Sequence, residues 1–145
     1  MSEGIERFIG YEFPPSEYTV DPAKHALFLK AVDGIPSSEG RAHPIMHFIA
    51  THAGKSVTFA QLMVLIDAPI DAGALFGQED LEIFRPLHVG ETVKVRGGIV
   101  DAKSKSGAKT GAFDTVTTSI ELVDGQGEVA CRSLETYIIP RAARP

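Results

Sequence analysis

The sequence predicts an α+β fold in which a curled antiparallel sheet wraps around a long helix. Helical signals fill the first half of the chain, to about Asp71, and segments of alternating apolar and polar residues fill the second half. The length also supports one domain, because 145 residues that are 43% hydrophobic suffice for a core. We therefore expect a single domain over residues 1–145, with its core from about residue 18 to residue 139.

The first helix is predicted to begin at Asp21-Pro22. Aspartate at the N-cap accepts hydrogen bonds from backbone N–H groups, and proline at the first helical position sacrifices none. The residues behind it repeat at helical spacing and predict an apolar stripe: Ala23, Ala26, Leu27, Lys30 and Ala31. Asp33-Gly34 ends this helix, and the aperiodic residues 35–40, with their proline and glycine, predict a loop.

A second helical stretch follows Pro44 and extends to Ile66. Gly54 weakens its periodicity, and Ser56 could cap a new turn. Either one long helix with a weak point at Gly54 or two short helices would satisfy the pattern. Residues Phe59–Ile66 are apolar nearly all round, which predicts burial on most sides.

Four segments predict strands: residues 78–84, 92–101, 112–123 and 129–139. Gly97-Gly98, inside the second of them, predicts a bulge or a tight bend. A polar loop over Lys103–Gly111 and an Asp-Gly turn at Asp124–Gly127 join the last three strands into an antiparallel meander. A sheet of this kind would supply the wrapping that the buried helix needs.

Charge and cysteine content restrict the function classes. The chain has 14 Lys+Arg against 19 Asp+Glu, a formal charge of −5, which argues against nucleic acid as a partner. A single cysteine, Cys131, excludes an internal disulfide and is typical of a protein from a reducing compartment. We expect Cys131 itself to be a small buried residue. The N-terminus does not read as a signal peptide, and the longest apolar stretch, Val57–Ile66, is too short to insert into a membrane. We expect a cytoplasmic protein.

The run from Gln78 to Thr92 resembles the signature stretch of MaoC-like dehydratases. Its most specific part is an Arg-Pro-Leu turn followed, after two residues, by Gly and an acid, here Arg85 to Glu91. The segments Tyr18–Asp21 and Arg41–Phe48 are similar to the opening and to the central-helix entry of the same family, and the likeness covers about residues 18–139. The resemblance implies a hot-dog fold of the half-domain type. It also implies (R)-specific hydration of enoyl thioesters, or dehydration of 3-hydroxyacyl thioesters, carried on coenzyme A or acyl carrier protein, with no cofactor.

Active members of that family carry Gly-Asp-x-Asn-Pro-x-His after the first long helix, where one group activates water and the other delivers a proton. The matching stretch here is Val32–Ser38: Asp33 and Pro36 agree, but Ile35 replaces the Asn and Ser38 replaces the His. A serine hydroxyl cannot accept a proton at neutral pH, so the motif is broken. Either the chain is a half that lost the pair and completes the acyl tunnel of a catalytic partner, or His43 or His47 replaces the lost His.

Seven residues are candidates for the site, of which the two lysines are chosen because they lie in a basic loop of an acidic protein. Asp33, His43 and His47 are the catalytic candidates, and Pro44, Arg85, Lys103 and Lys105 are the substrate-binding candidates. A structural role is the alternative to a role in the site for several of these residues. Asp33 could be a turn residue, His43 could cap the helix, Arg85 could stabilise the turn, and the lysines could lie in a solvated loop. Backbone N–H groups at the start of the central helix would polarise the thioester carbonyl.

Two rival functions and the partner remain open. A hot-dog acyl-CoA thioesterase would need an acid or amide on the central helix, for which Gln61 and Asp67 are the candidates, and a non-catalytic subunit would only bind acyl thioesters. A single hot-dog layer leaves a sheet edge uncovered, so we expect a homodimer or a heterodimer with a His-bearing chain. We expect no metal, because the pair His43-x-x-x-His47 lacks a third ligand.

Overall fold

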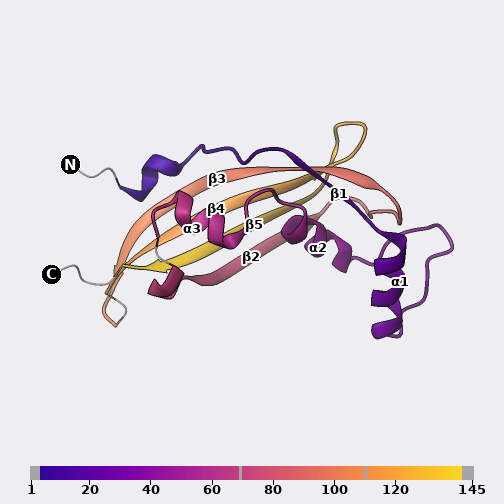
Figure 1. Cartoon of the computed structure of the whole chain (residues 1–145), viewed down its shortest axis with the longest axis horizontal. Helices are drawn as coiled ribbons and strands as arrows, with labels where there is room; N and C mark the ends of the chain where they lie inside the picture. The colour runs from indigo at the N-terminus through magenta and orange to yellow at the C-terminus, as the bar shows by residue number, and fades with distance from the viewer. Residues whose placement is uncertain (1–3, 69, 110, 142–145) are drawn as a thin grey trace.

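The computed structural model describes residues 4–68, 70–109 and 111–141 and contains a five-stranded antiparallel sheet. The strands lie in the order β1-β3-β4-β5-β2, and their bounds are β1 Ser16–Thr19, β2 Leu75–Ile83, β3 Thr92–Gly107, β4 Gly111–Val123 and β5 Val129–Pro140. The sheet curls around two short helices that lie across one of its faces (Figure 1). The predicted α+β class and the meander are confirmed. Short 3-10 turns occur at Ile5–Phe8 and Ile70–Ala72.

The predicted polar loop over Lys103–Gly111 is largely strand. Lys103 pairs with Thr115 and Lys105 with Phe113, and β3 continues to Gly107. This end of the hairpin is exposed on both faces, so no apolar alternation marks it as strand. Thr110, also within the predicted loop, lies outside the described residues.

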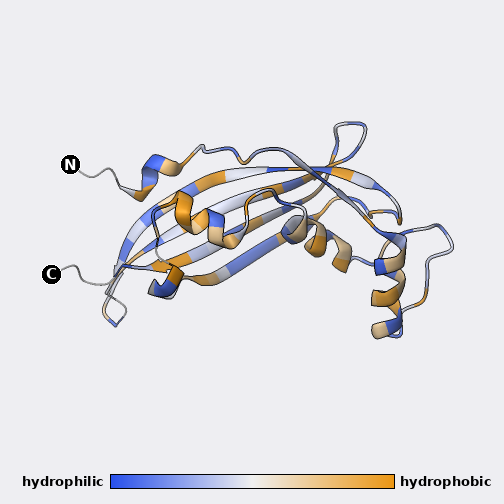
Figure 2. Cartoon of the chain, in the orientation of Figure 1, coloured by the Kyte–Doolittle hydropathy of each residue, from blue (hydrophilic) through white to orange (hydrophobic). Residues whose placement is uncertain are grey.

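Helix α1 (Pro22–Ala31) begins where the sequence predicts. The Oδ1 atom of Asp21 accepts hydrogen bonds from the backbone N–H groups of Ala23 and Lys24, at 2.8 and 3.2 Å. Its buried side chains are His25 and Leu29, whereas Leu27 of the predicted stripe is 69% exposed. The helix projects from the end of the sheet, with hydrophobic turns along its length (Figures 1 and 2). The stripe therefore faces away from the core of this chain.

The long central helix is instead two helices, α2 (Ile45–Ala53) and α3 (Phe59–Leu65). A Cβ atom on Gly54 would lie 2.5 Å from the carbonyl oxygen of Ala50 and 2.9 Å from Cβ of Tyr18, so glycine permits the close approach at this point. The second helix starts with a capping box in which Thr58 and Gln61 bond each other's backbone. The predicted cap, Ser56, donates to the carbonyl of Pro14 instead.

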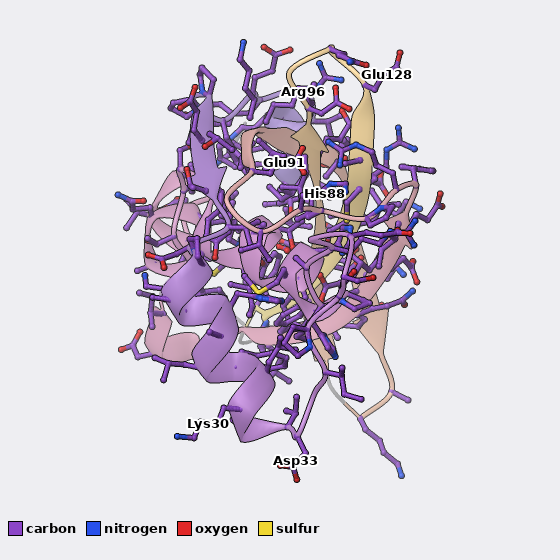
Figure 3. The ribbon with its side chains drawn as sticks, turned by 90° about the vertical axis from the view of Figure 1, so that its right-hand side faces the viewer. Lys30, Asp33, His88, Glu91, Arg96 and Glu128 are labelled. Carbon is purple, nitrogen blue, oxygen red and sulfur yellow. The ribbon has the colours of Figure 1, made fainter. Side chains whose placement is uncertain are left out.

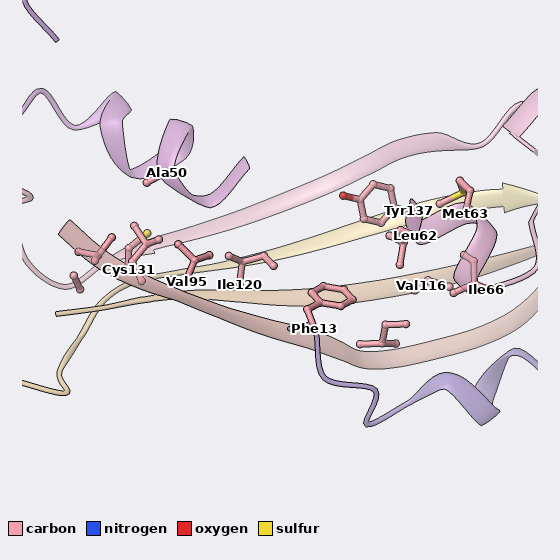
Figure 4. Close-up of a cluster of buried hydrophobic side chains, with 14 of the residues drawn as sticks. Phe13, Ala50, Leu62, Met63, Ile66, Val95, Val116, Ile120, Cys131 and Tyr137 are labelled. Carbon is pink, nitrogen blue, oxygen red and sulfur yellow. The ribbon is translucent and has the colours of Figure 1, made fainter. Parts of the chain in front are cut away.

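The core lies between these helices and the sheet (Figure 4). Leu62, Met63 and Ile66 are buried in one cluster with sheet residues that include Val116 and Ile120. Val64 is 79% and Phe59 is 37% exposed, so the prediction that residues 59–66 are buried on most sides is wrong: the outer face of this helix is open.

Cys131 is fully buried, as the sequence predicts. Burial, with a contribution from the nearby charge of Glu79, raises the pKa of its thiol to about 12. The thiol therefore stays protonated and behaves as a small apolar side chain.

Gly97-Gly98 is a point of close backbone approach, not a bulge. The N-terminal segment Tyr11–Phe13 runs beside β3, with hydrogen bonds from Phe13 N–H to the Gly97 carbonyl (2.8 Å) and from Ile99 N–H to the Tyr11 carbonyl (2.9 Å). The irregularity in the register of β3 lies slightly further on, between Ile99 and Asp101.

Among the helices that the structure describes, none has the length and apolarity to span a membrane.

Candidate functional site

A cavity of about 580 Å³ lies between α1, the loop that follows it, the start of α2 and the end of β2. Its apolar lining includes Leu29, Ile35, Pro44, Ile83, Phe84 and Pro86, and its polar lining includes His25, Ser37, Arg41, His43, His47 and Arg85. Four of the seven predicted site residues are therefore brought together here. The size and the mixed lining are typical of a small-molecule site.

Asp33 does not line this cavity. It occupies a left-handed backbone conformation (φ 53°) after α1, and its side chain points away from the molecule (Figure 3). Aspartate tolerates that conformation better than most residues, which agrees with the turn role. Ser38, the other end of the broken motif, is also exposed and outside the lining.

His43 caps the start of α2. Its Nδ1 atom accepts a hydrogen bond from the Ile45 N–H at 3.0 Å, and its ring contacts Phe28 edge-on at 5.0 Å. An imidazole that accepts at Nδ1 carries its proton at Nε2, so His43 can donate a hydrogen bond into the cavity but has no lone pair left to act as a base.

His25 is a cavity residue that the sequence did not single out as a site residue. It is 5% exposed, and its Nε2 atom accepts the backbone N–H of His43 at 2.9 Å. The signal that could have found it is its spacing of four residues from Leu29, which defines the buried face of α1.

His47 connects α2 to the end of β2. Its Nδ1 lies 2.9 Å from the Pro44 carbonyl oxygen, its Nε2 lies 2.9 Å from the Arg85 carbonyl oxygen, and the residue is 1% exposed. Carbonyl oxygens only accept, so both contacts are hydrogen bonds only when both ring nitrogens carry protons. Each ring nitrogen therefore faces a backbone carbonyl, and neither is directed at a substrate in the cavity.

The first amides of α2 are also occupied. The N–H groups of Ile45, Met46 and His47 donate to Nδ1 of His43, to the His43 carbonyl and to the Pro44 carbonyl, respectively. Pro44 itself has no N–H group. The donors that the resemblance assigned to the thioester carbonyl are therefore already used within the chain.

Arg85 reaches away from the cavity to fix the turn beyond β2. Its guanidinium donates to Glu91, to Asp124 at 3.1 Å and to the Pro86 carbonyl at 2.6 Å. The hydrogen bond to Glu91 raises the pKa of Arg85. Burial alone would raise the pKa of Glu91, but the hydrogen bonds from Arg85 and from the His88 backbone outweigh it and lower that pKa. The guanidinium therefore pins the turn.

Replacing Arg85 by alanine is expected to lower the free energy of unfolding at pH 7 by about 2–3 kcal/mol, because charged hydrogen bonds to a partly buried carboxylate are lost. Since the pKa of Glu91 is lowered in the folded state, this stabilisation is present above the usual value of 4.5 and is lost as the pH falls through the folded-state pKa. Urea denaturation at pH 7 and pH 3 measures both effects.

The matched control for this prediction is Arg96→Ala, which removes an ion pair to Glu121 from a 58% exposed side chain. It should change stability by less than about 1 kcal/mol. A deficit of Arg85→Ala that is equally large at both pH values would contradict the assigned role of Glu91.

Lys103 and Lys105 are not near the cavity. They lie toward the β3–β4 hairpin, at the opposite end of the sheet from α1 (Figure 1), and Lys103 pairs with Asp101 at 3.4 Å. The lining residue with an exposed cationic side chain is Arg41, which is 56% exposed and forms an ion pair with Glu39 at 2.9 Å. Sequence reasoning did not single out Arg41 as a site residue.

Together, a curled sheet around short helices and an apolar cavity beside the central helix define a hot-dog protein. Sequence comparison identifies the family: residues 7–133 match the "FAS1-like, dehydratase domain region" family, and the chain belongs to it. No protein of curated function matches the sequence.

Three solved structures illustrate the likeness of fold. The truncated HadBC (3R-hydroxyacyl-ACP dehydratase) complex of Mycobacterium tuberculosis is 16% identical, with 95% of this chain and 99% of that chain covered and a TM-score of 0.66. The MaoC-like dehydratase of Rhodospirillum rubrum is 20% identical, with 94% of each chain covered and a TM-score of 0.62. The ChsH1-ChsH2 complex of Mycobacterium tuberculosis is 15% identical, with 97% and 90% covered and a TM-score of 0.70. The likeness to MaoC-like dehydratases that the sequence suggests is confirmed.

Proposed function

We propose that this chain is the non-catalytic, acyl-binding half of an (R)-specific enoyl-thioester hydratase or 3-hydroxyacyl-thioester dehydratase. The family supports the hydratase/dehydratase kind. Hydration of a double bond needs a base and an acid and no redox group, so the proposal requires no cofactor.

The observation that carries the proposal is the chemistry of the cavity lining. Among the described residues, no carboxylate lines it, and the ring nitrogens of His25, His43 and His47 that could accept a proton are all engaged with the backbone. A site without a free base can bind an enoyl thioester but cannot activate water. Of the two explanations for the broken motif, this favours loss of the pair over relocation to His43 or His47.

The lining also supports an acyl thioester as the ligand. Ile83, Phe84 and Leu29 offer an apolar wall to a hydrocarbon chain, and the exposed guanidinium of Arg41 lies at the cavity for the phosphates of coenzyme A or of a carrier-protein arm. Lys103 and Lys105 would reach such phosphates only from another chain.

The exposed apolar surface supports a partner subunit. Edge strand β2 and the residue after it expose Leu75, Phe76, Ile83 and Phe84, and α1 with its loop exposes Leu27, Val32 and Ile35. An uncovered edge strand with apolar side chains pairs readily with another chain. The HadBC and ChsH1-ChsH2 structures are complexes of two different chains. We propose a His-bearing MaoC-like chain as the partner, with a homodimer as the alternative.

The test measures binding and turnover on the purified chain. Titration calorimetry with a long-chain saturated acyl-CoA should show saturable binding, while crotonyl-CoA and longer trans-2-enoyl-CoA thioesters should not be hydrated above the uncatalysed rate. Ile35→Glu and Phe84→Asp, which place a charge at the cavity, should weaken binding at least about tenfold. The control Val64→Asp alters an exposed apolar residue on α3, outside the cavity, and should bind normally.

Three results would contradict the proposal. Absence of binding would remove the acyl-binding role. Hydration by the chain alone, abolished by Asp33→Ala or His43→Ala, would show a relocated active site. Release of free coenzyme A would indicate a thioesterase, although Gln61 is engaged in the cap of α3 and Asp67 is exposed beyond its end.

A further inference from the structure

A second group of polar side chains lies on the side of α2 that faces the sheet, outside the cavity beside α1. It joins three elements: His52 on α2, Glu79 on β2 and Glu135 on β5. The Nε2 atom of His52 lies 3.1 Å from Oε1 of Glu79 and 3.4 Å from Oε1 of Glu135. These three atoms all lie within 4.8 Å of one another.

One oxygen in this group has no hydrogen-bond partner among the described residues. Glu135 is fully buried, and its Oε2 atom accepts hydrogen bonds from Lys55 (3.1 Å) and from the hydroxyl of Tyr137 (2.8 Å). No residue in the described part of the chain donates a hydrogen bond to its Oε1 atom. The single proton that Nε2 of His52 can carry is already directed to Glu79. A buried carboxylate oxygen without a donor is costly, and native proteins rarely leave one empty.

The charges of the group do not balance either. Two carboxylates face one ammonium group, that of Lys55, within the described part of the chain, so one negative charge is uncompensated when His52 is neutral. The carboxylates are 12% and 0% exposed, where water screens them little. A cation at the point where the three atoms converge would remove the imbalance.

We propose that His52, Glu79 and Glu135 form a binding site for a divalent first-row transition-metal ion. Ligand atoms about 2.0–2.2 Å from one ion lie about 2.9–3.5 Å from each other, and both distances from Nε2 fall in that range. One imidazole and two carboxylates are ligands that Zn²⁺, Mn²⁺ and Co²⁺ share. The imidazole would then carry its proton on Nδ1.

The surroundings hold the three ligands in place. Ser133 donates to Oε1 of Glu79 at 2.7 Å, and Lys55 and Tyr137 bond only the second oxygen of Glu135, which leaves the first for the ion. The ring of His52 packs against Phe48, with 4.2 Å between centroids. His52 is 27% exposed, so the site opens to solvent on one side, where water or hydroxide could complete the coordination.

The experiment uses the full chain after dialysis against EDTA. Calorimetric titration with Zn²⁺ should show one ion per chain, and Co²⁺ should produce a visible absorption band of a nitrogen–oxygen site. Both signals should weaken about 100-fold or more in Glu135→Gln, since loss of a ligand should exceed the roughly 10–100-fold effect of losing an outer-shell partner. Glu79→Gln, which removes a ligand at the less buried edge strand, should give the same result if Glu135→Gln folds poorly.

The matched controls are Glu82→Gln on the same strand and His88→Gln in the following turn, both exposed, and both should bind like the wild type. Absence of saturable binding by the wild type would overturn the proposal. So would equal binding by the wild type and by the two ligand variants, Glu135→Gln and Glu79→Gln, because the ion would then be held elsewhere. Neither outcome depends on the acyl-binding function.

Discussion

Replacement of Lys55 by methionine is expected to lower the free energy of unfolding by about 3–5 kcal/mol, because a buried carboxylate loses its charged partner. The ammonium group is the fixed cation beside the buried carboxylate of Glu135, at 3.1 Å. Methionine keeps the length and the apolar stem of the side chain but leaves a fully buried carboxylate with too little positive charge. Equilibrium denaturation in the presence of EDTA measures the loss without interference from metal.

Two variants isolate the cause. Lys24→Met, on the exposed surface of α1, should change stability by less than about 0.5 kcal/mol. The double variant Lys55→Met/Glu135→Gln removes both charges and should recover most of the loss, so the double-mutant cycle should give a large coupling energy. A single Lys55→Met variant within about 1 kcal/mol of the wild type would show that Glu135 does not depend on this ammonium group.

Replacement of Gly98 by alanine is expected to lower the free energy of unfolding by about 2–4 kcal/mol. The added Cβ would lie 2.3 Å from the carbonyl oxygen of Tyr11, and that neighbour is backbone, which cannot rotate aside. The N-terminal segment would have to move off β3, with loss of the hydrogen bonds between Phe13 and Gly97 and between Ile99 and Tyr11.

Amide hydrogen exchange locates this effect. The N–H groups of Phe13 and Ile99 should exchange faster in Gly98→Ala than in the wild type, because they donate across the crossing. Gly125→Ala is the control: no described atom beyond its chain neighbours lies within 4 Å of its added Cβ, so it should be neutral. Unchanged exchange at Phe13 in Gly98→Ala would mean that the segment adapts without separating from β3.

The parts of the fold that were predicted from sequence are those set by local chemistry. The cap at Asp21, the turn at Asp124 and the alternation of β4 and β5 each depend on neighbours close in the chain. The parts that were missed depend on distant contacts. Gly54 marks a weak point in the helical pattern, but the choice between one helix and two depends on Tyr18, which lies against Gly54 and is distant in the chain.

For the site, too, the features set by local sequence were predicted and those set by distant contacts were not. The sequence identified four residues that line the cavity, because the helix entry and the Arg-Pro-Leu turn are local signatures: His43, Pro44, His47 and Arg85. The structural alternatives for His43, helix capping, and for Arg85, fixing the turn, were predicted and are confirmed. The role of His47 was not predicted, since its partner is set by the tertiary fold: its Nε2 atom lies at the carbonyl of Arg85. The cluster of His52, Glu79 and Glu135 could not be found either, because its members come from three separate elements.

The two edges of the sheet are unequal, and this limits how the chain can polymerise. On one side β1 has four residues and is preceded by Pro14-Pro15, whose missing N–H groups interrupt any ladder. On the other side β2 has nine residues and exposed apolar side chains. If the chain pairs through β2 as proposed, the sheet would form a closed pair and then stop, because the short β1 and the prolines before it would prevent growth into a fibre.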